Sequence, residues 1–204
     1  MSVLIIDYGM GNLASVRRAF EECGAFVFIS ADPADITKAS HIVLPGVGSF
    51  AQAMGNLHAT GWTQALKEYV VSKNIPFLGI CLGMQLLASR GEEHGDTEGL
   101  GFVPGVVRKF EALGSLRIPH VGWNEIKPSR DNDLLARIDD GTDFYFVHSY
   151  FFDADDQADI VATTPYGTDF PSIVARGKVW GTQFHPEKSG VAGFELIRNF
   201  LAAA

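Results

Sequence analysis

Short apolar runs alternate with segments of helical spacing in the first half of the chain. Four runs are typical of buried strands: residues 3–7, 26–30, 41–44 and 77–81. Helical patterns follow the first, third and fourth runs, with a break near Gly61, and the last of them covers residues 83–89. Strands that are apolar at nearly every position indicate a parallel sheet that helices cover on both faces.

The second half has a different pattern, in which short strands are joined by short turns. The predicted strands are residues 106–110, 121–127, 144–152, 160–164, 173–176 and 179–184. Arg176-Gly177-Lys178 is typical of a hairpin turn, so antiparallel pairing is expected here. A final helix over residues 190–201 covers the sheet. The whole pattern predicts one α/β domain over residues 1–204, with a mixed, largely parallel central sheet and helices on both faces.

Charge and cysteine content narrow the possible partners. The 204 residues include 16 basic and 24 acidic side chains, a formal net charge of −8. Nucleic acids and anionic membranes need a basic surface, so neither is an expected partner. No apolar run approaches the roughly 20 residues that span a bilayer, and residues 1–7 lack the features of a signal peptide. Two cysteines form no disulfide framework, so we expect reduced thiols and a cytoplasmic protein.

The segment Gly79-Ile80-Cys81-Leu82-Gly83 is a G-x-C-x-G version of the nucleophile elbow. Its position between a predicted strand and a predicted helix is the one this motif requires. The nucleophile of an elbow sits at a strained turn, and the residues two before and two after it must be small. The helix N-terminus favours a thiolate at Cys81, and the N–H of Leu82 points to where an oxyanion would form.

A buried structural cysteine is the alternative interpretation of Cys81, because cysteine is often buried. Cys23 has no comparable context. It follows Glu21-Glu22 near a predicted helix end, where acidic neighbours disfavour a thiolate. We therefore interpret Cys23 as structural and Cys81 as the candidate nucleophile.

A thiol nucleophile needs a base, and His185 is the best candidate among six histidines. Pro186 follows it and favours an extended backbone at His185. Residues i and i+2 share a face of an extended chain, so Glu187 can accept the Nδ1–H and leave Nε2 free. A surface turn is the alternative. His41 and His58 are interpreted as structural, and no histidine pair has metal-ligand spacing, so no metal is expected.

The glycine-rich segment of residues 45–50 follows a strand and begins a helix. It lacks the Gly-Lys-Ser/Thr ending of a phosphate-binding P-loop. An oxyanion hole usually pairs the N–H after the nucleophile with one from another strand–helix loop, and this loop is the natural donor. A plain tight turn remains the alternative interpretation.

With these residues placed, the chain resembles the triad (class I) glutamine amidotransferases over nearly its whole length. Its two strongest matching motifs are Gly-Ile-Cys-Leu-Gly-Met-Gln (79–85) and Gln-Phe-His-Pro-Glu-Lys-Ser (183–189). Three further segments are similar to the glutaminase subunits of imidazole-glycerol-phosphate synthase, which act in histidine biosynthesis. They are Asp-Tyr-Gly-Met-Gly-Asn-Leu (7–13), His-Val-Gly-Trp-Asn (120–124) and Tyr-Phe-Val-His-Ser-Tyr (145–150).

The resemblance implies a role for each matching residue. Cys81 would attack the glutamine carboxamide, His185 would act as acid and base, and Glu187 would orient His185. The resemblance implies an oxyanion hole from Val47, Gly48 and Leu82. The glutamine-binding residues that it implies are Gly46, Gln85, Glu93, His148, Ser149 and Tyr150. No cofactor is implied.

The resemblance also implies a partner, a (β/α)8-barrel synthase subunit that receives the ammonia in a heterodimer. The implied interface residues are Tyr8, Asn12, Trp123 and Lys188. A lone tryptophan in a strand is also typical of a core, so that alternative stays open for Trp123. The phosphorylated nucleotide substrate is expected to bind the partner, because a chain with a net charge of −8 offers no evident phosphate site.

Three rival functions remain open. The first is another triad amidotransferase subunit, such as that of pyridoxal-phosphate synthase, anthranilate synthase or guanosine monophosphate synthetase; residues 7–13 and 120–124 argue against it. The second is a cysteine hydrolase of the same architecture, a peptidase or gamma-glutamyl hydrolase, which would act without a partner. The third is a non-enzymatic binding or redox-sensing protein with a reactive thiol.

Overall fold

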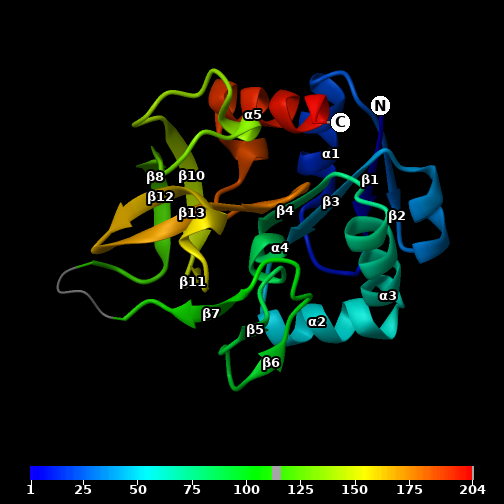
Figure 1. Ribbon diagram of the computed structural model, residues 1–204, viewed down its shortest axis with the longest axis horizontal. Coiled ribbons are helices and arrows are strands. Elements are labelled where there is room, and N and C mark those ends of the chain that lie inside the picture. The colour runs from blue at the N-terminus through cyan, green and yellow to red at the C-terminus, as the bar shows by residue number, and fades with distance from the viewer. Residues whose placement is uncertain (112–115, 204) are drawn as a thin grey trace.

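An eight-stranded sheet forms the centre of the computed structural model, which describes residues 1–111 and 116–203 (Figure 1). Its order is β2 (Phe26–Ser30), β1 (Ser2–Ile6), β3 (His41–Gly46), β4 (Phe77–Cys81), β14 (Val179–Thr182), β13 (Thr168–Arg176), β12 (Ile160–Tyr166) and β9 (Lys127–Pro128). The strands from β2 to β14 are parallel, and the last three are antiparallel. The predicted mixed, largely parallel sheet is confirmed.

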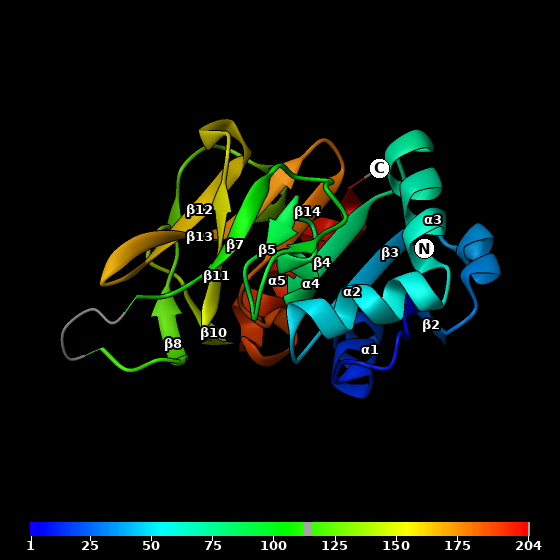
Figure 2. The same cartoon turned by 90° about the horizontal axis from the view of Figure 1, so that it is seen from below.

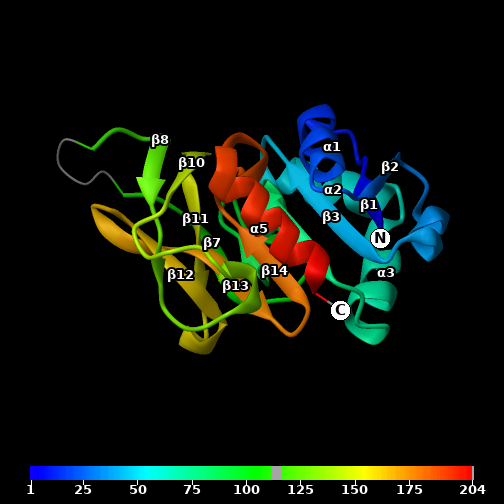
Figure 3. The same ribbon diagram turned by 90° about the horizontal axis from the view of Figure 1, so that it is seen from above.

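Helices cover both faces of this sheet, as predicted. Figure 3 shows α1 (Leu13–Glu22) and α5 (Gly190–Ala202) on one face, and Figure 2 shows α2 (Phe50–Ala59) on the opposite one, where α3 (Trp62–Leu66) and α4 (Leu82–Gln85) also pack. Alternate residues of each strand serve the two layers: Ile5 packs in the core with Phe20 of α1, whereas Leu4 packs with Leu57 of α2.

Two smaller sheets stand beside the central one. One pairs β8 (His120–Glu125) with β10 (Asp143–His148), and the other has the order β11 (Tyr150–Ala154), β7 (Gly105–Lys109), β5 (Arg90–Gly91) and β6 (Thr97–Glu98). The predicted single strand 144–152 is therefore wrong, because the chain changes sheets at Ser149. The predicted strand 121–127 is likewise split between β8 and β9. Residues 144, 146 and 148 are buried before the change and residues 152 and 154 after it, with Tyr150 and Phe151 both half-buried between them. The buried positions keep the same parity, so the spacing of apolar residues does not mark the change of partner.

Some element boundaries also differ from the prediction. The helix expected over 83–89 ends at Gln85, after which Leu87 and Ala88 donate to carbonyls three residues back in a tight turn. The strand expected over 179–184 ends at Thr182. The expected break near Gly61 is confirmed, with φ +81° at that residue. The remaining helical segments are the 3₁₀ helices Pro33–Lys38, Asp133–Leu135, Gln157–Asp159 and Pro186–Lys188, and the π-helix Lys67–Ser72, which directly follows α3.

The carboxyl ends of the parallel strands bring the candidate residues to one edge of the sheet. Gly46 at the end of β3 lies in register with Cys81 at the end of β4, and Thr182 of β14 pairs with Ile80. Open α/β sheets bind ligands outside such carboxyl ends. Topology thus places the elbow, the glycine loop and the His185 segment side by side.

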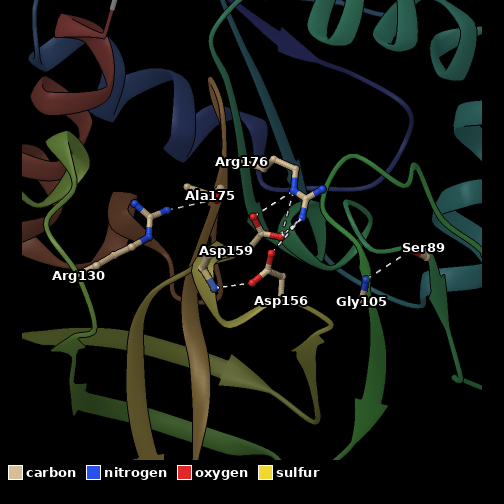
Figure 4. Close-up of polar contacts among 8 residues, drawn as sticks. Ser89, Gly105, Arg130, Asp156, Asp159, Ala175 and Arg176 are labelled. Atoms are coloured by element: carbon tan, nitrogen blue, oxygen red, sulfur yellow. Dashed lines mark hydrogen bonds and ion pairs between the residues drawn. The ribbon is translucent and has the colours of Figure 1, made fainter.

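The opposite end of β14 is fastened by ion pairs. Arg176 binds Asp159 through two nitrogens, at 3.1 Å from Nε to Oδ1 and 2.7 Å from Nη2 to Oδ2, and Asp156 lies nearby (Figure 4). Arg130 donates to the Ala175 carbonyl at 3.3 Å. A bidentate pair with a buried carboxylate fixes the β13–β14 hairpin. None of the helices in the described ranges has the length and apolar character that crossing a membrane requires.

Candidate active site

Cys81 occupies a strained corner between β4 and α4. Its backbone has φ +56° and ψ −109°, a conformation that costs a non-glycine residue about 1–3 kcal/mol. The flanking glycines make the corner possible. A Cβ on Gly83 would collide with the Leu44 carbonyl oxygen, and one on Gly79 would lie 2.5 Å from the Gly83 carbonyl oxygen. The elbow predicted from the G-x-C-x-G segment is therefore present in the backbone.

The side chains of His185 and Glu187 are hydrogen-bonded to each other. The backbone of His185 is extended, as expected for a residue that precedes a proline. His185 Nδ1 lies 2.8 Å from Glu187 Oε1, and the two side chains are 4% and 2% exposed. A carboxylate can only accept, so Nδ1 carries the hydrogen. Nε2 is buried and has no hydrogen-bond partner within the described residues. The free nitrogen of the candidate base is thus available to a neighbouring group.

Strand β10 holds the His185 backbone in place. The His185 N–H donates to the Tyr145 carbonyl at 2.9 Å, and the Ser189 hydroxyl links the His185 carbonyl to the Tyr145 N–H. Burial opposes the charged imidazolium, but interactions with Cys81 and Glu187 outweigh it and raise the pKa of His185 to about 9. The site therefore favours an imidazolium beside Cys81 and Glu187.

A cavity of about 280 Å³ joins Cys81 and His185. It also brings together most of the other predicted site residues. Its lining is Val47, Gly48, Cys81, Leu82, Gln85, Glu93, Val147, His148, Ser149, Tyr150 and His185. Gly46 lies behind this lining at the end of β3. The pocket has the shape and chemistry for a small polar substrate beside a thiol.

Gln183 is a site residue that sequence reasoning missed. It is fully buried, and its Nε2 lies 3.8 Å from the Cys81 sulfur. Gln85 Nε2 donates to the Gln183 Oε1 at 3.0 Å and to the Tyr150 carbonyl at 2.9 Å. Gln183 is the first residue of the matching segment 183–189, two residues before His185, and this position is the signal that could have identified it.

Glu93 connects the pocket to the glycine loop. Its Oε2 accepts the Phe50 N–H at 2.6 Å, at the first turn of α2, where the Ser49 side chain makes no cap. The positive end of the helix favours such a carboxylate. Within the loop, Gly48 has φ +110° and Val47 is 46% exposed on the pocket rim.

The predicted interface residues occupy different environments. Trp123 is 58% exposed, so the core alternative is wrong for this residue. Asn12 and Lys188 are also exposed; Asn12 caps α1, and Lys188 Nζ lies 5.7 Å from the Tyr145 ring centre. The expectation that Tyr8 lies at the interface is wrong. Its side chain is 3% exposed, its hydroxyl adjoins Gly46, and burial raises its pKa. Its side chain offers no surface contact.

The other candidate groups lie away from the pocket. Cys23 is half-buried, and its Sγ lies 3.5 Å from the Phe194 carbonyl. His41 is buried and bonded to the Ala203 carbonyl, while His58 is exposed. Within residues 1–111 and 116–203, no three His, Cys, Asp or Glu side chains are grouped so as to hold a metal ion.

Comparison with known proteins agrees with this geometry. The model of the family Glutamine amidotransferase class-I matches residues 4–204. Imidazole glycerol phosphate synthase subunit HisH of Moorella thermoacetica is 46% identical, over 97% of this chain and 93% of that protein. Subunit HisH 1 of Campylobacter jejuni subsp. jejuni is 48% identical, over 97% and 98%.

Solved structures share the fold at low sequence identity. A crystal structure of a glutamine amidotransferase superposes with a TM-score of 0.76 at 18% identity, covering 97% of this chain and 96% of that one. The structure of PurLQS from Thermotoga maritima gives a TM-score of 0.77 at 15% identity, covering 98% and 97%.

Proposed function

The chain belongs to the class-I glutamine amidotransferase family, and we propose that it is the glutaminase subunit of an imidazole glycerol phosphate synthase, acting in histidine biosynthesis. The observation that carries the proposal is the meeting of an elbow cysteine and a carboxylate-bonded histidine in one pocket. The identity of nearly half of all positions with two proteins named as subunits of that synthase supports the particular reaction.

The first half of the reaction is acyl transfer to sulfur. The Cys81 thiolate attacks the carboxamide carbon of glutamine, and the charge moves to the carbonyl oxygen. His185, as imidazolium, gives its Nε2 proton to the leaving nitrogen as the carbon–nitrogen bond breaks. Ammonia departs, and a γ-glutamyl thioester remains on Cys81. A pKa of His185 near 9 keeps the required proton on this ring at neutral pH.

The second half restores the enzyme with one water molecule. Neutral His185 now takes a proton from water through Nε2, and the resulting hydroxide attacks the thioester carbon. The carbon–sulfur bond breaks, glutamate leaves, and the Cys81 thiolate again faces an imidazolium. Glu187 keeps the hydrogen on Nδ1 throughout and stabilises the charged ring. The sum is glutamine and water converted to glutamate and ammonia.

Two backbone segments border the place where the oxyanion forms. Leu82 is the first residue of α4, and helix N-terminal N–H groups have no partner within the helix. The Val47–Gly48 backbone faces it across the pocket. We propose that these N–H groups stabilise the tetrahedral intermediate, with Gly48 permitting the loop to turn a peptide toward the oxygen.

The polar groups of the pocket suit the two ends of glutamine. The Glu93 carboxylate is the anionic group for the substrate ammonium. The Gln85 amide already donates both hydrogens within the protein, so its Oε1 is left to accept from the substrate. We propose that the backbone of His148, Ser149 and Tyr150 completes this subsite, and that the predicted residue Gly46 supports it from behind the pocket lining.

Ammonia is proposed to pass to a (β/α)8-barrel synthase subunit in a heterodimer. Support comes from exposed apolar side chains beside the pocket, namely Val47, Val121, Trp123 and Val147. Asn12 and Lys188 are proposed to join this surface, and the partner is proposed to bind the phosphorylated nucleotide. No cofactor takes part in these steps. Two free cysteines suit the reducing cytoplasm that we propose as the location.

The test is a glutaminase assay of the chain alone, with the barrel synthase, and with the synthase and its nucleotide ligand. The proposal predicts slow hydrolysis alone and strong stimulation by the liganded partner. Full activity of the isolated chain would instead support an independent cysteine hydrolase. Absence of hydrolysis under all three conditions would exclude the glutaminase.

A further inference from the structure

A continuous chain of buried and partly buried hydrogen bonds runs from strand β8 to the sulfur of Cys81. From β8 inward its members are Asn124, His120, His148, Tyr150, Gln85 and Gln183. The first five links join polar atoms that are 3.2, 2.9, 2.8, 2.9 and 3.0 Å apart, in that order. The sixth places Gln183 Nε2 3.8 Å from Cys81 Sγ. We call this set the polar relay.

The direction of each histidine bond is fixed by the Tyr150 carbonyl, which can only accept. His148 must therefore donate through Nδ1, and a neutral ring then accepts at Nε2. The donor to that nitrogen is Nδ1 of His120, whose own Nε2 must accept from the Asn124 amide. The second hydrogen of this amide goes to the Pro165 carbonyl at 2.9 Å.

The same carbonyl fixes the two glutamine amides. Gln85 Nε2 donates one hydrogen to Tyr150 and the other to Gln183 Oε1. With its oxygen so engaged, Gln183 presents its N–H to the sulfur of Cys81. Each link of the polar relay thus pairs a donor with an acceptor, and reversing any one group within it would place two donors or two acceptors face to face.

Burial keeps both rings neutral, as this arrangement requires. It lowers the pKa of His120 to about 4 and that of His148 to about 3. Packing fixes the ring of His120 as well, because it stacks on Phe146 at 4.9 Å and on Tyr166 at 4.0 Å between ring centres. The polar relay therefore has one arrangement at neutral pH.

Strand β8 presents a different set of side chains on each face. His120 and Asn124 point inward into the polar relay, whereas Val121 and Trp123 are 55% and 58% exposed. The pairing of β8 with β10 carries the pattern to His148, which lies opposite His120 in register. The exposed outer face of β8 and the β8 end of the polar relay are thus parts of the same strand.

We propose that His120 and Gln183 are positioning residues for the amide-transfer reaction. His120 holds His148 and, through it, the Tyr150 carbonyl that aligns Gln85 in the glutamine subsite. Gln183 aims its amide N–H at the sulfur and restrains the nucleophile between attacks. This inference rests on the function proposed above, and it adds a route by which a partner on β8 acts on glutamine binding and on Cys81.

The arrangement itself is tested on the wild-type protein without any assay of activity. Long-range ¹⁵N–¹H spectra at pH 7 report which nitrogen of each histidine carries the hydrogen. We expect His120 and His148 to be neutral with the hydrogen on Nδ1, assigned by the signals that vanish in His120→Phe. The Nε2–H form or an imidazolium at either residue would overturn the polar relay.

Kinetics with the synthase complex test the positioning role. His120→Phe keeps the ring stacking and removes both hydrogen bonds, while His120→Asn retains a donor near the Nδ1 position. We expect His120→Phe to lower kcat/KM for glutamine about tenfold with a raised KM, and His120→Asn to recover part of the loss. His41→Phe is the matched control, a buried bonded histidine at the far end of β3, and should stay within about twofold.

A double substitution tests whether His120 and Gln183 act through one connected network or independently of each other. Gln183→Met preserves volume and removes the amide, and its effect should combine with His120→Phe in less than multiplicative fashion, because both break one network. A merely structural role would reduce the active fraction and leave KM unchanged. Unaltered kinetics in folded His120→Phe, an unchanged KM, or multiplicative effects would overturn the inference. A wild-type complex that does not hydrolyse glutamine would instead overturn the proposed function. In that case the histidine tautomers measured by NMR would still show whether the polar relay exists.

Discussion

His185 Nδ1 lies 2.8 Å from Glu187 Oε1, and both side chains are almost fully buried only two residues apart. His185 is extended, and the 3₁₀ turn that begins at Pro186 brings Glu187 back to its ring, so the pair is a local product of this short segment. Cys81 comes to it from another strand. The protonation of His185 is therefore coupled to groups that are together only in the folded state.

Stability should fall as pH rises from about 6.5 to about 9. The pKa of His185 rises from 6.5 to about 9 on folding, because Cys81 and Glu187 outweigh its burial. The folded state then holds a proton that the unfolded state releases, so the contribution is complete below pH 6.5 and lost as pH passes 9. We expect a loss of roughly 2–3 kcal/mol in the free energy of unfolding, measured by urea titration across this range.

Glu187→Gln is the comparison for that measurement. It removes one of the charges that stabilise the imidazolium, so the fall in stability over the same range should shrink. The kcat for glutamine hydrolysis should drop by at least about tenfold. An identical pH profile and an unchanged kcat would exclude Glu187 from the triad.

The elbow should tolerate no side chain at Gly83. A Cβ there collides with the Leu44 carbonyl oxygen, so Gly83→Ala should lower the free energy of unfolding by about 2–4 kcal/mol. Gly55→Ala is the control, since Gly55 lies within α2 and a Cβ there meets nothing within 4 Å. It should stabilise by about 0.5–1 kcal/mol. Equal effects in thermal unfolding would contradict the close contact of the elbow with β3.

The glycine loop should show a loss of activity beyond its loss of stability. Gly48 has φ +110° and Gly24 has φ +87°, both unfavourable for alanine. Gly24→Ala should therefore destabilise by about 1–2 kcal/mol, and Gly48→Ala by at least as much, because a Cβ at Gly48 would also lie 2.6 Å from the end of the Met10 side chain. Only Gly48→Ala should reduce partner-stimulated glutaminase activity, by about tenfold or more. Equal residual activities in the two variants would remove the loop from the oxyanion hole.

Trp123 should contribute to partner binding and little to the fold. Trp123→Ala should weaken affinity for the barrel synthase at least about tenfold while changing stability by no more than about 0.5 kcal/mol. Phe26→Ala is the control, because Phe26 is 72% exposed on β2, at the opposite end of the molecule (Figure 3). Calorimetric titration measures the affinity of each variant for the barrel synthase. Equal affinities of the two variants would place the interface elsewhere.

Much of the fold follows from local patterns. Apolar strands separated by helical spacing identify the parallel layer, and Gly79 and Gly83 identify the elbow because only a glycine fits where two backbones touch. The His-Pro-Glu spacing predicts the bond between His185 and Glu187. Each of these features is determined by a short stretch of sequence, so it can be predicted without knowing which distant segments come into contact.

The features that sequence reasoning missed depend on contacts between distant segments. The buried positions have the same parity before and after Ser149, so the spacing of apolar residues does not mark the change of sheets. The roles of Gln183 and His120 depend on hydrogen-bond partners that lie in distant segments of the chain. Tyr8 was expected at the interface only because it lies in a segment that matches the resembled family, and its burial beside Gly46 depends on contacts that the segment does not contain.

The central claim is that Cys81 attacks the amide of glutamine in this pocket. A diazo-ketone analogue of glutamine, added to the complex with the barrel synthase and followed by intact-mass and peptide-mass spectrometry, tests it most directly. We predict one adduct, on Cys81 and not on Cys23, with parallel loss of glutaminase activity and protection by glutamine. Labelling of Cys23 to the same extent, or an unlabelled Cys81 while activity is lost, would contradict the account.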